Sequence, residues 1–105
     1  MKNFLMIVAA AGLVLAGGAN AADADKAKAL AQSKNCLACH AIATKLVGPA
    51  FTEVSKKYKG NKDAEAMLAK KVIAGGGGVW GTIPMPPNPV KEDEAKLLVS
   101  WILAM

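Results

Sequence analysis

Four stretches of the chain place apolar residues on one helical face, and the segments between them are rich in glycine and proline. Residues 23–35 repeat alanine and leucine at steps of three and four, which is the spacing of an amphipathic helix. The same spacing recurs in a short segment that begins at Phe51, in residues 63–73 and in residues 92–105. No run alternates apolar and polar residues in the manner of a half-buried strand. The pattern therefore predicts a small helical domain.

Residues 75–89 break this helical pattern. The segment contains four consecutive glycines, then Trp80, and then Met85 with prolines on both sides. Proline fixes φ and removes a backbone donor, so a helix is excluded here. A flexible linker rarely carries a tryptophan and a proline-flanked methionine directly after its glycines. We predict a loop that lies against a flat ligand.

The first 21 residues differ in composition from the rest. Lys2 gives a positive start, residues 4–16 carry no charge, and the stretch ends in the small triplet Ala19-Asn20-Ala21. The chain of 105 residues is 53% hydrophobic, and this segment carries much of that share. A membrane anchor needs about 20 apolar residues, which is longer than this run. We predict a secretory signal, residues 1–21, that is cleaved after Ala21 and leaves one domain of residues 22–105.

Both cysteines and the only histidine lie together in the segment Cys36-Leu37-Ala38-Cys39-His40. This is the C-x-x-C-H pattern for covalent attachment of a c-type haem, in which each cysteine forms a thioether and the histidine ligates the iron. A structural zinc site wants four protein ligands and the chain has no second pair. A thioredoxin-like pair needs a βαβ setting, and a disulfide across so short a loop stabilises little. We therefore predict one covalently attached haem c, with His40 as its proximal ligand.

The second axial position has several candidates, because His40 has no histidine partner in the chain. A methionine, a lysine, water or nothing remains. Met67 lies on a helical apolar face, where packing is expected, and Met105 is the last residue. Met85 lies between prolines that stiffen the chain enough to hold a weak thioether ligand. We predict Met85 as the sixth ligand, and the alternative is an open iron site beside which Met85 only packs.

This ligation decides between two classes of function. An iron with both axial positions filled has no free site for a substrate, and methionine ligation favours the reduced form. The chain also has no second histidine for acid–base work. We therefore predict a one-electron carrier and not an enzyme. The alternative is an open-site c-type haem protein that binds or senses a small ligand.

The chain resembles the small soluble bacterial class I cytochromes c of the c-551/c-552 type. This likeness covers nearly all of the predicted domain and runs through the haem motif, residues 45–50, 78–81 and 83–88, and the closing Trp101-Ile102-Leu103. It implies the class I cytochrome c fold, all-α, with four to five short helices wrapped around one covalently attached haem. It also implies periplasmic electron transport between respiratory complexes and a terminal reductase or oxidase. The partners expected from the resemblance are a nitrite reductase, a terminal oxidase or a membrane cytochrome complex.

The resemblance implies further roles at matching positions. Pro49 would steady His40 through its carbonyl region, and the indole N–H of Trp80 would reach a haem propionate. Lys71 stands where relatives have a basic residue near the propionates. The alternatives are a core role for Trp80 and a solvated helix end for Lys71.

Two more expectations concern the last helix. Trp101 is expected to pack in the core, against the haem or the first helix. Lys91 stands where relatives have a Ser or Asp cap, so the last helix is expected to start less firmly.

The charge of the chain constrains its partners. The net charge is +5, the lysines are spread along the chain and there is no arginine. A nucleic-acid binder would more often cluster arginine with exposed aromatics, whereas a moderate positive charge suits steering toward an acidic redox protein. We expect a monomer without stable membrane insertion, with a contact patch at Leu46, Val47 and Pro86. We also expect the chain to be mostly unfolded without haem, because so small a domain depends on its cofactor.

Overall fold

The computed structural model describes residues 21–105, and the predicted export signal lies outside these residues except for Ala21. All the helices that the apolar spacing predicts are present, with ends that differ by one or two residues. In chain order the elements are α1 (Ala21–Ser33), the 3-10 helix η1 (Cys36–Ala38), α2 (Phe51–Tyr58), α3 (Ala64–Ala74) and α4 (Glu92–Leu103). Within residues 21–105 the only β-type pairing is an isolated antiparallel bridge between Gly76 and Met85. The fold is therefore all-α, as expected.

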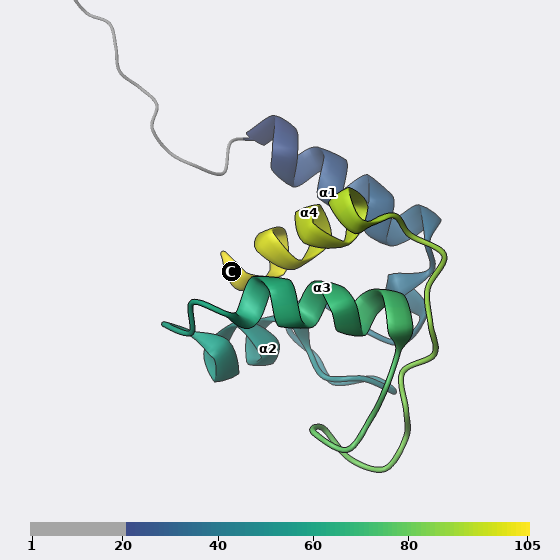
Figure 1. The fold of residues 1–105 in the computed structure, drawn as a ribbon. Coiled ribbons are helices and arrows are strands. Elements are labelled where there is room, and N and C mark those ends of the chain that lie inside the picture. Colours follow the sequence, from purple (N-terminus) through teal and green to yellow (C-terminus); the bar gives the residue numbers. More distant parts are fainter. Residues whose placement is uncertain (1–20) are drawn as a thin grey trace, which may run out of the picture.

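Helix α4 is the centre of the packing. It contacts α1, α2 and α3, and it crosses α1 as Figure 1 shows. The buried core is made of small side chains, chiefly alanines of α1, α3 and α4, and its larger members are Leu98 and Val99. Small side chains let helices approach closely, but they bury little apolar surface. The helices alone therefore make a thin core.

Two hydrogen bonds outside the regular helical pattern help to hold α4. The buried Ser55 of α2 donates from Oγ to the carbonyl of Leu103 at 3.1 Å, which ties α2 to the end of α4. At the other end, Glu94 Oε1 accepts from the Lys91 backbone N–H at 2.8 Å. A lysine has no acceptor with which to cap a helix, but Glu94 supplies half of a capping box. Lys91 therefore weakens the start of α4 less than the sequence suggests.

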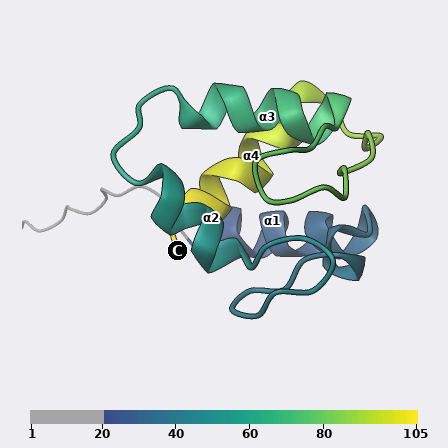
Figure 2. The same cartoon turned by 90° about the horizontal axis from the view of Figure 1, so that it is seen from below.

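Two long connections position the functional residues. We call residues 39–50 the proximal loop and residues 75–91 the distal loop. In Figure 1 the proximal loop and the first part of the distal loop lie below α3, and the rest of the distal loop rises past the end of α3 to α4; Figure 2 shows the molecule from below. No helix within residues 21–105 is both long and apolar enough to cross a bilayer.

Candidate haem site

A cavity of about 350 Å³ lies between the two loops and the helices α2, α3 and α4. Its volume lies in the range of small-molecule sites. All the site residues predicted from the sequence line it, and they are Cys36, Cys39, His40, Pro49, Lys71, Trp80 and Met85. The fold thus brings residues that lie far apart in the sequence to one place.

A tight turn presents the two cysteines. Asn35 adopts a left-handed conformation (φ 63°), and the 3-10 helix η1 follows it. The N–H groups of Cys39 and His40 both donate to the carbonyl of Cys36, at 3.2 and 3.0 Å. Both thiols are half-buried and free. Burial raises the pKa of the Cys36 thiol, although a hydrogen bond from its own backbone opposes this.

The imidazole of His40 has a defined proton arrangement. Its Nδ1 lies 2.8 Å from the carbonyl oxygen of Pro49. A carbonyl only accepts, so Nδ1 carries the proton and donates it. In the neutral ring Nε2 is then unprotonated and free to ligate a metal, an arrangement common among metal-binding histidines. The expectation that the Pro49 carbonyl steadies His40 agrees with this contact.

Close packing holds the His40 ring in place. The ring stacks on Phe51 with 5.1 Å between centroids, and Phe51 meets Trp101 edge-on at 5.8 Å. Trp101 packs on the core, as predicted. A Cβ at Gly48 would lie 2.6 Å from Cε1 of His40, so only glycine fits there. The sequence did not single out Gly48 or Phe51 as part of the site, because their role depends on where the imidazole lies.

Met85 is held by backbone geometry. It exchanges two hydrogen bonds with Gly76, at 2.9 and 2.8 Å, and its side chain is half-buried. Gly75 has φ 77°, and a Cβ there would lie 2.6 Å from the Met85 carbonyl oxygen. The glycines before Met85 are therefore needed by the fold of the loop. Neither Met67 nor Met105 lines the cavity, and Met67 is 43% exposed, so the expectation that it packs in the core was wrong.

Asn88 is a residue that the sequence pattern did not reveal as functional. Its side-chain Nδ2 donates to the carbonyls of Val72, at 3.0 Å, and Pro86, at 3.1 Å. Its backbone N–H also donates to Val72, at 3.2 Å. Asn88 therefore anchors the chain that follows Met85 to the end of α3. An amide directly after two prolines was the available signal, but nothing in the sequence indicates its partners.

Trp80 and Lys71 lie at the cavity in different ways. Trp80 is at the tip of the distal loop, lines the cavity and is 41% exposed. Lys71 is half-buried on α3, and a Cβ at Gly76 would lie 3.7 Å from its Nζ. Lys71 is therefore not simply a solvated helix end. Both side chains are available to a polar group at the cavity mouth.

The donors and the cavity fit a covalently bound haem. Two thiols lie on one turn, an imidazole with a free Nε2 follows them, and a thioether lines the same mostly apolar cavity. A helical domain built around such a site is a small c-type cytochrome. The comparisons with known proteins agree, because the cytochrome c family is matched over residues 24–105. This chain belongs to the cytochrome c family.

Relatives cover the chain almost completely. Cytochrome c-551 of Pseudomonas aeruginosa is 49% identical, over 99% of this chain and 98% of its own length. Cytochrome c-552 of Hydrogenobacter thermophilus is also 49% identical, over 100% of this chain and 99% of its own. Among solved structures, wild-type cytochrome c552 of Nitrosomonas europaea has a TM-score of 0.70 at 49% identity, and covers 72% of this chain and 95% of its own. The chain is thus an electron-transfer protein with covalently attached haem c, and not an enzyme.

Proposed function

We propose that residues 22–105 form a periplasmic one-electron carrier whose haem is attached through Cys36 and Cys39 and ligated by His40 and Met85. One observation carries this proposal: the two thiols, the imidazole and the Met85 side chain line the same cavity, although Cys36 comes from η1, Cys39 and His40 from the proximal loop and Met85 from the distal loop. The bound haem iron would supply the one-electron couple.

The residues around the two ligands favour a rigid site. His40 is held by the Pro49 carbonyl and by the ring of Phe51. Met85 is held by its hydrogen-bonded pairing with Gly76. Ligands that are held in place before and after electron transfer keep the structural change small. The place of Met85 in the cavity favours this ligation over the open-site alternative, because a thioether on the iron would leave a small ligand no free site.

The lengths of the relatives support export and cleavage. The Pseudomonas relative matches 99% of this chain. The solved Nitrosomonas structure is matched over 95% of its own length but covers only 72% of this chain. A mature domain of residues 22–105, without residues 1–21, fits this difference. The proposed carrier works in the periplasm after this cleavage.

The surface near the cavity supports a redox protein as partner. Leu46 and Val47 are about half exposed, and Pro86 is exposed beside the cavity. Such an apolar patch, together with a positive net charge of +5 for the whole chain and +4 without Lys2, suits docking to an acidic reductase, oxidase or membrane cytochrome complex. Trp80 and Lys71 would face the haem propionates from the mouth of the cavity. The carrier acts as a monomer and contacts no nucleic acid.

The ligand assignment is tested on the purified holoprotein. We expect the weak far-red ferric band of methionine-sulfur ligation and only slow carbon monoxide binding after reduction. Met85→Ala should remove the band, open the site to carbon monoxide and lower the reduction potential, whereas Met67→Ala should change none of these. Rapid carbon monoxide binding by the unaltered protein, or an unchanged spectrum in Met85→Ala, would refute the assignment.

A further inference from the structure

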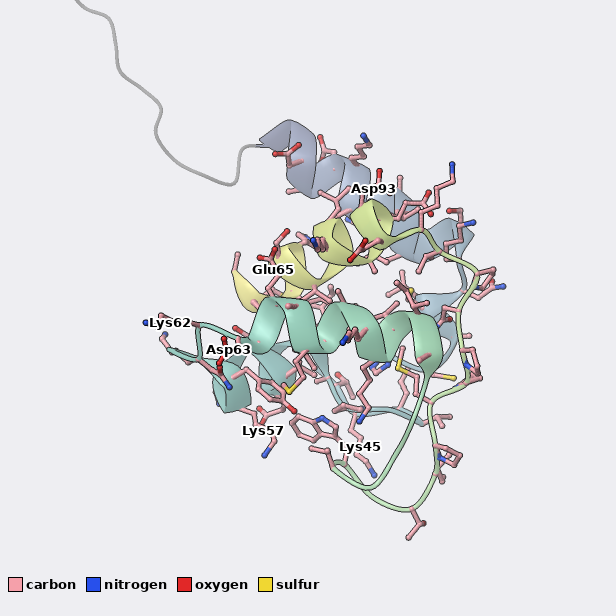
Figure 3. All side chains as sticks on the ribbon, viewed as in Figure 1. Lys45, Lys57, Lys62, Asp63, Glu65 and Asp93 are labelled. Carbon is pink, nitrogen blue, oxygen red and sulfur yellow. The ribbon has the colours of Figure 1, made fainter. Side chains whose placement is uncertain are left out.

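Lys57 joins helix α2 to the tip of the distal loop. Its Nζ lies 5.7 Å from the ring centroid of Trp80 and 5.8 Å from that of Tyr58. Both distances are within the roughly 6 Å over which an ammonium is attracted to an aromatic face. In Figure 3 Lys57 lies below α3, on the side where the distal loop runs.

The neighbouring lysine has different surroundings. Lys56 forms an ion pair with Glu53 at 3.6 Å, and its side chain is 77% exposed. Lys57 forms no such ion pair within residues 21–105. Two adjacent lysines of one helix therefore differ in their partners: Lys56 pairs with a carboxylate, and Lys57 contacts the two rings.

The tip of the distal loop has few other restraints. It is closed by one backbone hydrogen bond, from the N–H of Gly78 to the carbonyl of Gly81 at 3.1 Å. Both glycines have positive φ, and a Cβ on either would meet nothing within 4 Å. Val79 and Trp80 are 49% and 41% exposed. A single contact from outside the loop can therefore decide where the tip lies.

We propose that Lys57 is a positioning residue that holds Trp80, and with it the tip of the distal loop, at the mouth of the haem cavity. Helix α2 then serves both sides of the site. Its first residue, Phe51, stacks on His40, and Lys57 near its end holds Trp80. One rigid helix of two turns thereby sets the position of the proximal imidazole and of the distal tip together.

The test uses the reduced holoprotein and hydrogen exchange measured by NMR. Lys57→Met keeps the length of the side chain and removes its charge, Lys57→Arg keeps a charge, and Lys56→Met is the matched control. An exposed cation–π contact is worth about 0.5–1 kcal/mol, so exchange of the Trp80 indole N–H and of the Gly78 amide should be about 2- to 5-fold faster in Lys57→Met. Exchange at these two sites should stay unchanged in Lys57→Arg and Lys56→Met. The Trp101 indole is the internal reference and should not respond.

A role in packing alone would give a different result, because methionine would fill the same space. Equal exchange in Lys57→Met and Lys56→Met would overturn the proposal. Exchange in Lys57→Arg that is as fast as in Lys57→Met would overturn it as well. A second variant gives an independent check. In a Trp80→Leu background, Lys57→Met should no longer change exchange of the Gly78 amide, and a persisting 2- to 5-fold effect would show that Lys57 acts on the loop by another route.

Discussion

The proximal and distal loops hold their ligands by different means. In the proximal loop, His40 is fixed through its side chain, by a hydrogen bond to Pro49 and by stacking on the buried ring of Phe51. In the distal loop, Met85 is fixed through its backbone, by pairing with Gly76. An imidazole offers a second polar atom and a flat face by which it can be held, whereas a thioether offers neither. The methionine side chain therefore cannot be fixed directly, and the chain fixes the backbone of the loop that carries it.

Removal of the haem should produce the largest effect, because it removes the group that both loops face. In a Cys36→Ala/Cys39→Ala variant produced without haem, the apolar cavity of about 350 Å³ has no occupant. At roughly 24 cal/mol per Å³ such a cavity costs on the order of 8 kcal/mol, which is comparable with the whole stability of a small domain. We expect a mostly unfolded chain by far-UV circular dichroism. A cooperative thermal transition with native-like helix content would contradict this expectation.

Gly75→Ala should damage the distal loop strongly. The position has φ 77° and ψ −175°, which side chains rarely adopt, and a Cβ would lie 2.6 Å from the Met85 carbonyl. Backbone strain and overpacking together should cost about 2–5 kcal/mol. We expect a lower thermal midpoint, a weaker far-red band and faster carbon monoxide binding.

Gly60→Ala is the matched control for this prediction. Gly60 has φ 82°, but a Cβ there meets nothing within 4 Å. It should lower the thermal midpoint by a smaller amount and leave the far-red band intact. Equal loss of the band in both variants would mean that overall stability, and not the contact with Met85, controls the sixth ligand.

The sequence predicts the two loops unequally well. The proximal ligand could be read from C-x-x-C-H, because that chemistry needs neighbouring residues, and the helices followed from apolar spacing. The choice of Met85 relied on its prolines, but the contacts that hold the loop could not be predicted. Gly76 pairs with the Met85 backbone and the Asn88 side chain donates to Val72, and both contacts depend on positions that exist only in the folded loop. The exposure of Met67 was also missed, since a helical face does not tell how much of it another helix covers.

Gly48→Ala should affect the proximal side and have a smaller effect on stability. The added methyl group would lie 2.6 Å from Cε1 of His40, and the backbone there is not left-handed, so only overpacking of about 1–3 kcal/mol is expected. The imidazole has to tilt, which should shift its NMR signals in the reduced holoprotein while those of Met85 stay in place. Gly77→Ala is the counterpart in the distal loop, with a looser contact of 3.1 Å to Pro84, and it should leave the His40 signals unchanged. Disturbance of His40 by both variants would mean that the two loops do not hold their ligands separately.

Asn88→Ala should have the smallest effect and one confined to the distal loop. It removes two side-chain hydrogen bonds, to Val72 and Pro86, while the backbone N–H of residue 88 still donates to Val72. At about 0.5–1 kcal/mol for each bond, the lower part of the usual range because one of them is exposed, the loss should be about 1–2 kcal/mol. Because the anchor lies three residues after Met85, this loss should appear as opening of the loop, with carbon monoxide binding that is about 5- to 30-fold faster. Asn61→Ala, which removes an exposed hydrogen bond before α3, should not change carbon monoxide binding. If both variants bind carbon monoxide equally fast, Asn88 is no anchor of Met85, and the backbone pairing with Gly76 holds the ligand without it.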